Sequence, residues 1–259
     1  MMRKNIIPRL LNVHPEKLAC CFHTIVSSCF LACYISMAVT VLIADNKYLT
    51  NRFLADGFAS MGYLFSMWVL ASETICFGMY TAIDILGLYY KQSEKAVKMS
   101  KTLRTVASHM LFSVVFPLSV VVLILFWGFY FYDRELIYPA ILDELLPPFI
   151  NHMMHTYPVP LSILYMFTDI KKEPPKYKTL GLLTVFMTIY SLLFIDARKK
   201  RGQWIYPALE ALTPLGAIWV LTSSLIGSFV FFFLGYYLYG KIKDMRSYIK
   251  QKVKELKSL

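Results

Sequence analysis

The chain has 259 residues, of which 57% are hydrophobic and 16% aromatic. A soluble domain of this length cannot bury so much apolar surface, so the composition excludes a soluble globular fold and indicates a membrane protein. The net charge of +11 could suggest nucleic acid, but Lys and Arg lie beside the apolar blocks, where anionic headgroups attract them. Nucleic acid is therefore not an expected partner.

Six apolar blocks follow one another along the chain, each close to the ~20 residues that a helix needs to cross the hydrocarbon core. They are Leu18–Ala44, Gly57–Tyr90, His109–Tyr132, Leu145–Thr168, Leu180–Ile195 and Pro214–Gly240. Neither an open sheet nor the alternating segments of a membrane barrel fit this pattern. The sequence predicts an all-α polytopic bundle of about six transmembrane helices, with one domain over residues 1–240 and a basic cytosolic tail over residues 241–259.

The distribution of Lys and Arg orients these spans. With both termini on one side, 20 of these residues fall on that side and 7 on the other. We therefore expect both termini in the cytosol, in either the endoplasmic reticulum or the plasma membrane. The run from Arg198 to Arg201 is the exception, because this topology places it on the outer side. All five cysteines lie within apolar blocks, so free thiols are expected rather than disulfides.

The second block carries polar groups that a spanning helix rarely contains. At ~100° per residue, Ser66, Glu73 and Asp84 project from one face of a helix. A polar interface between helices would be enough to explain Ser66, since serine is common there. Glu73 is harder to explain in that way, because a carboxyl group inside a membrane needs a partner or a wet cavity. We expect it to tune or hydrate such a cavity.

The fourth block is the most unusual segment. Asn151, His152 and His155 lie on one side of a helix, just before Pro158 and Pro160, which should kink it and open a cavity. A structural histidine is the simplest alternative. A metal site is less favoured, because the chain has only 5 histidines and lacks the rest of a coordination shell. The remaining hypothesis is that one neutral imidazole acts as a general base.

Ser66 and His155 lie at compatible depths. Both helices run from the outside inwards in the predicted topology, which puts Ser66 at ~6–14 Å and His155 at ~15 Å below the outer boundary. The two side chains can therefore meet if their helices pack together.

Three segments resemble the androgen-induced protein and ADTRP family. The run Tyr132–Pro139, with Asn151–Thr156 downstream, is similar to the first signature of that family, and Gly202–Glu210 resembles its second hallmark. Weaker similarity covers Phe77-Gly78 and the third block, so the resemblance extends from about residue 60 over most of the chain.

The resemblance implies a multi-pass membrane hydrolase that cleaves fatty acid esters of hydroxy fatty acids with a threonine nucleophile and a histidine. The histidine of the motif falls on His155. The nucleophile position, aligned without gaps to Phe77-Gly78, falls on Ser66, so serine replaces threonine. A Lys-Tyr-Leu-Thr string ending at Thr50 is the competing match, in a predicted outer loop at the wrong depth for His155.

The expected reaction is an attack by Ser66 on a fatty ester carbonyl, with His155 taking the proton and no cofactor. Asn151, His152 or a backbone amide is expected to support the oxyanion, and Arg134 to hold the carboxylate of the lipid ester substrate. The alternative is a non-catalytic lipid-binding or regulatory membrane protein. A transporter is less favoured, because the sequence has no internal repeat.

Overall fold

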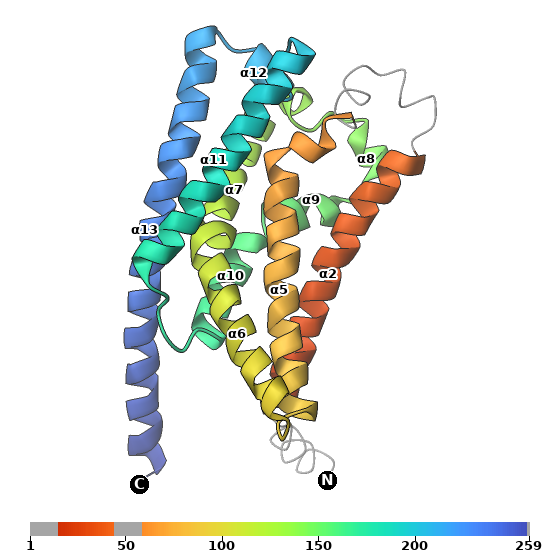
Figure 1. Ribbon diagram of the computed structural model, residues 1–259. Coiled ribbons are helices and arrows are strands. Elements are labelled where there is room, and N and C mark those ends of the chain that lie inside the picture. Colours follow the sequence, from red (N-terminus) through yellow and green to blue (C-terminus); the bar gives the residue numbers. More distant parts are fainter. Residues whose placement is uncertain (1–14, 44–58, 258–259) are drawn as a thin grey trace, which may run out of the picture.

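The computed structural model describes residues 15–43 and 59–257, and all regular secondary structure within them is helical. The long helices are α2 (Pro15–Ile43), α5 (Phe65–Tyr89), α6 (Glu94–Met110), α7 (Phe116–Asp133), α11 (Lys176–Arg201) and α13 (Pro214–Lys257). The shorter ones are α8 (Leu142–Leu145), α9 (Pro148–His155), α10 (Pro158–Thr168) and α12 (Pro207–Glu210). Five stretches are long and apolar enough to cross a membrane: α2, α5, α6 with α7, α11, and α13. The predicted all-α membrane bundle is confirmed (Figure 1).

α6 and α7 form one long span joined by a π-helical turn at Leu111–Val115. Pro117 has no N–H to donate to the carbonyl of Ser113, which gives a local reason for the wider turn. Residues 91–104, which connect the second and third apolar blocks, are helical for most of their length. The helix already begins at Glu94, because the side chain of Ser93 caps it by accepting a hydrogen bond from the amide of Ala96.

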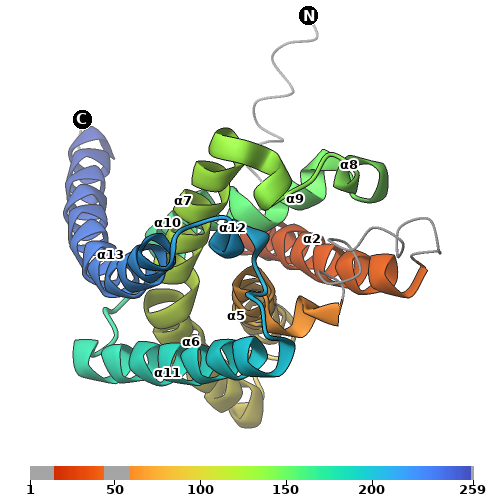
Figure 2. The same cartoon turned by 90° about the horizontal axis from the view of Figure 1, so that it is seen from above.

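This α6–α7 span is the centre of the bundle. The share of buried residues in its most apolar window is 72%, against 17% to 44% in the other four spans. Seen from above, α7 lies among α5, α9, α10 and α13, all of which contact it (Figure 2). The outer spans expose apolar faces, as expected where lipid replaces water.

The fourth apolar block is two short helices rather than the single span that we predicted. α9 has 8 residues and α10 has 11, so neither crosses the hydrocarbon core alone. The predicted break at the prolines is confirmed: α9 ends at His155 and α10 begins at Pro158, which cannot donate to a preceding carbonyl and disfavours a helical conformation before it. The break leaves the end of α9 inside the bundle.

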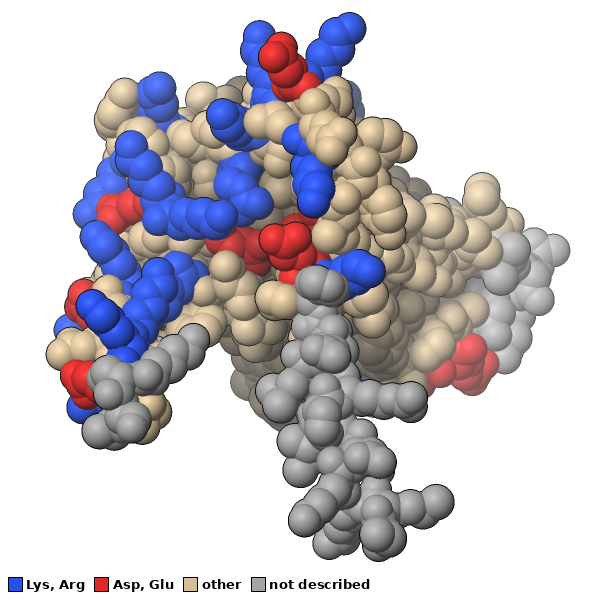
Figure 3. Space-filling model, turned by 90° about the horizontal axis from the view of Figure 1, so that it is seen from below, with Lys and Arg blue, Asp and Glu red and all other residues tan. Residues whose placement is uncertain are grey.

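The bundle has two distinct ends. The start of α5, the end of α11, α12 and the start of α13 gather at what we call the upper end, and the start of α2 and the end of α13 lie at the lower end (Figure 1). Lys and Arg crowd the lower face (Figure 3). At the upper end, Gly202 adopts a positive φ of 72° that terminates α11, and the carbonyls of this helix end favour the cations Arg198 to Arg201.

The charge distribution supports an expected result for topology. A glycosylation sequon engineered into residues 46–56 should be modified, and one appended before Met1 should not, because α2 and α5 run in opposite directions, and the end of α2 and the start of α5 lie away from the basic lower face. Gel mobility with and without a deglycosylating enzyme measures this. Modification at the N-terminus alone would reverse the assigned orientation.

Candidate functional site

A cavity of about 670 Å³ lies at the upper end of the bundle. Its wall comes from the start of α5, from α7, α9, α11 and α13, and from the segments around α8 and α12. Most lining side chains are apolar, and a few polar groups converge among them, as is typical of sites for apolar ligands. Ser66, Asn151 and His155 all line this cavity. The structure therefore brings together residues that sequence reasoning paired across two helices.

Ser66 occupies the second position of α5, at the N-terminal end of the helix. The preceding amide, that of Phe65, donates a 2.6 Å hydrogen bond to the hydroxyl of Tyr206. Within the described residues, neither the amide nor the hydroxyl of Ser66 has a hydrogen-bond partner. A free backbone donor and the positive end of the helix dipole thus lie beside a hydroxyl at the cavity wall.

His155 is held in one orientation. Its Nδ1 lies 3.0 Å from the backbone oxygen of Asn151 and 2.7 Å from the Oδ1 of the same residue. A backbone carbonyl only accepts, so Nδ1 must carry the hydrogen, and in the neutral ring Nε2 keeps its lone pair. The ring stacks on Phe126 with centroids 3.6 Å apart and planes 7° apart. The imidazole is therefore fixed in the tautomer that a general base requires.

The neighbours of His155, Asn151 and His152, make different contacts. Asn151 directs both of its oxygens at Nδ1, so it orients the base. The Nδ1 of His152 lies 3.0 Å from the hydroxyl of Thr156, which also accepts from the indole of Trp127 at 3.1 Å. His152 is not among the cavity-lining residues and fits the structural alternative.

Glu73 and Arg134 also lie away from the cavity wall. Glu73 is fully buried between α5 and α7, where its carboxyl accepts a 2.7 Å hydrogen bond from Ser119. The guanidinium of Arg134 pairs with the carboxylate of Asp143 at 2.8 Å. The structure does not bring either residue to the cavity, and Thr50 lies outside the described residues.

The whole arrangement falls within a region shared with known proteins. A family model described as FAR-17a/AIG1-like protein matches residues 27–240. The chain belongs to this family. It is 30% identical over 184 residues to the human androgen-induced gene 1 protein, covering 70% of this chain and 77% of the relative. It is 32% identical over 175 residues to the mouse androgen-dependent TFPI-regulating protein, covering 66% and 70% respectively. No solved structure matches the chain.

Both segments on which the sequence resemblance rests line the cavity. The first contributes Tyr138, Asn151 and His155 to the wall, and the second contributes every residue from Gln203 to Glu210. Two motifs about 60 residues apart in the sequence therefore enclose one space. Sequence reasoning noted the second hallmark and gave it no place in the site.

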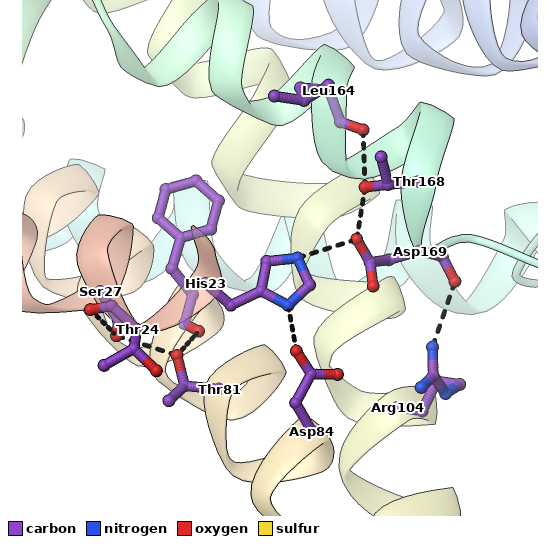
Figure 4. A network of polar contacts seen from close by, with 10 residues as sticks. His23, Thr24, Ser27, Thr81, Asp84, Arg104, Leu164, Thr168 and Asp169 are labelled. Carbon is purple, nitrogen blue, oxygen red and sulfur yellow. Dashed lines mark hydrogen bonds and ion pairs between the residues drawn. The ribbon is translucent and has the colours of Figure 1, made fainter. Parts of the chain in front are cut away.

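A second buried polar cluster lies toward the lower end and was missed. His23 on α2 lies between two carboxylates, with Nδ1 2.6 Å from Asp84 and Nε2 3.1 Å from Asp169 (Figure 4). Arg104 on α6 donates to the backbone oxygen of Asp169 at 3.2 Å. Since both ring nitrogens face carboxylates, the arrangement is complementary to an imidazolium, which donates from both. The sequence contained one signal of this cluster, namely that His23 is an ionisable residue within the first apolar block.

This cluster does not line the cavity. It connects α2, α5 and the end of α10. Within it, Asp84 pairs with His23, which contacts neither Ser66 nor Glu73 through a hydrogen bond among the described residues. The three polar residues predicted on one face of α5 therefore lie in three environments at different depths. Ser66 lines the cavity, Glu73 lies at the interface with α7, and Asp84 belongs to the ion cluster with α2.

Proposed function

We propose that this protein hydrolyses fatty esters within the membrane, with Ser66 as nucleophile and His155 as general base. The observation that carries the proposal is that a serine hydroxyl and an imidazole Nε2, both without a hydrogen-bond partner among the described residues, line the same apolar cavity. A dyad of this kind, with the base oriented by a third group, is the usual device for acyl transfer. Here Asn151 is the orienting group.

The reaction proceeds in two stages. His155 Nε2 takes the proton from Ser66 Oγ as Oγ bonds to the ester carbonyl carbon, and the protonated imidazole then gives that proton to the departing alcohol oxygen. Water next loses a proton to Nε2 and attacks the acyl-serine, and the proton returns to Ser66 Oγ as the carboxylic acid leaves. No cofactor takes part in either stage.

The oxyanion of each tetrahedral intermediate needs a donor. The amide of Ser66 is the candidate, because it has no acceptor among the described residues and stands at the positive end of α5. Such preorganised donors are often the largest single contribution to acyl-transfer catalysis. Asn151 orients His155 through its two oxygens, so within this residue only the Nδ2 amide group can donate to an oxyanion.

The substrate class that we propose is fatty acid esters of hydroxy fatty acids. The cavity is apolar, as a ligand with two long chains requires, and the motifs that enclose it are those carrying the sequence resemblance. The names of the relatives state no reaction. A non-catalytic lipid-binding protein is the second candidate, favoured by one observation: within the described residues no hydrogen bond joins Ser66 to His155.

Labelling with a fluorophosphonate separates these two candidates. The wild-type protein in membranes should form a covalent adduct at Ser66, because only an activated hydroxyl reacts. His155→Ala should label far more slowly, and Ser66→Ala should not label. Ser191→Ala is the matched control, since Ser191 lines the same cavity. No adduct on the wild-type protein would favour the lipid-binding function.

A further inference from the structure

Four cations end α11, and their side chains have different surroundings. The guanidinium of Arg198 lies over the ring of Trp204, 5.2 Å from its centroid. Lys200 pairs with Asp196 at 2.7 Å. Arg201 lines the cavity, whereas Lys199 is exposed and does not. One cation of this run therefore faces the space where we place the ester.

Arg201 is the only Lys or Arg among the described residues that line the cavity. Glu210 is the one lining carboxylate in the same part of the chain, and its Oε1 accepts a 2.7 Å hydrogen bond from the amide of Trp204. The side chain of Gln203 also reaches the wall and adds an amide donor. Arg134, the earlier candidate for binding a carboxylate, lies outside the wall and pairs with Asp143.

A guanidinium at the wall of an apolar cavity favours an anionic ligand. It carries five N–H donors, so Arg201 can keep a protein partner and still bind a carboxylate through two parallel hydrogen bonds. The attraction between opposite charges is stronger there than in water, because the surroundings have a low dielectric constant. A ligand with a neutral head gains none of this attraction.

The geometry points to a carboxylate subsite at Arg201 and Gln203, which holds the free acid head of a lipid whose chain extends through the cavity toward Ser66. This subsite gives a function to one of the cations at the upper end of the bundle, Arg201. The assignment of an ester along the chain depends on the proposed hydrolase function. The binding of a fatty carboxylate does not.

Binding of lipids to the protein in nanodiscs tests the subsite without requiring activity. The probes are a fluorescent long-chain fatty acid and the alcohol with the same chain. We expect Arg201→Gln to weaken binding of the acid by ~10–100-fold and to leave binding of the alcohol unchanged, because the lost contact is a charge-assisted hydrogen bond. Arg201→Lys should bind the acid with an affinity between those of the wild type and Arg201→Gln, since it keeps the charge and loses the planar arrangement of donors.

Lys199→Gln is the matched control and should bind both probes as the wild type does. Unchanged alcohol binding shows that a variant is folded. Equal weakening of acid and alcohol in Arg201→Gln would overturn the subsite, and so would tighter binding of a lipid with a phosphate head. If Ser66 catalysed hydrolysis and Arg201 had no effect on acid binding, only the subsite would be wrong. If Arg201 bound the acid and the protein did not hydrolyse esters, only the proposed enzyme function would be wrong.

Discussion

Replacing Ser66 by Ala should lower the rate of ester hydrolysis by ~10³-fold or more, because the acyl-enzyme route loses its nucleophile. His155→Ala should lower it by ~10²–10⁴-fold, the usual contribution of a positioned general base. Both losses should appear in kcat, with the protein present in membranes at normal amounts. Release of hydroxy fatty acid from an ester of defined structure, followed by mass spectrometry, measures these rates.

The controls for this experiment come from the same cavity and the same helix. Ser191→Ala removes another hydroxyl from the wall and should retain nearly full activity, as should His152→Ala, whose ring contacts Thr156 outside the wall. Thr50→Ala should also remain active. If Thr50→Ala were inactive and Ser66→Ala active, the assignment of the nucleophile would be wrong while the hydrolase function would stand.

The fold class followed from the sequence because apolar blocks long enough to span a membrane have few other solutions. The break before Pro158 was also predictable, since it depends on the chemistry of one residue. The start of α6 was not predictable from the sequence, because its many charged residues are also typical of a loop. Only the cap by Ser93 and contacts with neighbouring helices show that this segment is helical.

The part of the site that depends on the spacing of residues along a helix was predictable from the sequence. The part that depends on a partner elsewhere in the chain was not. Asn151 and His155 are four residues apart, which places them together on any helix. Which atom of Asn151 meets which ring nitrogen depends on side-chain rotation. The rarity of charge in a membrane drew attention to Glu73, and a position near the outer end of the third span drew attention to Arg134, yet neither observation identifies the partner of the charged group. Their partners, Ser119 and Asp143, came from the structure.

His23 illustrates the same limit over a longer range, since its two carboxylates lie 61 and 146 residues away in the chain. Replacing His23 by Ala should lower the free energy of unfolding by about 3–5 kcal/mol, because removing one partner leaves buried charges uncompensated. Asp84 and Asp169 would then share the interior without the cation between them. Thermal unfolding in detergent, followed by the reactivity of buried cysteines, measures the change.

The control for His23 is His109→Ala, because His109 is only partly buried and the hydrogen bond of its ring, to the backbone oxygen of Thr105, lies within its own helix. It should unfold as the wild type does.

Replacing His23, Asp84 and Asp169 together by apolar residues of similar size should recover much of the stability, since no uncompensated charge remains and the new side chains can pack. Recovery would identify lost charge compensation as the cause of the single-variant loss. If the triple variant were less stable than His23→Ala, the two carboxylates would be making stabilising contacts that do not depend on His23, and lost charge compensation would not explain the single-variant loss.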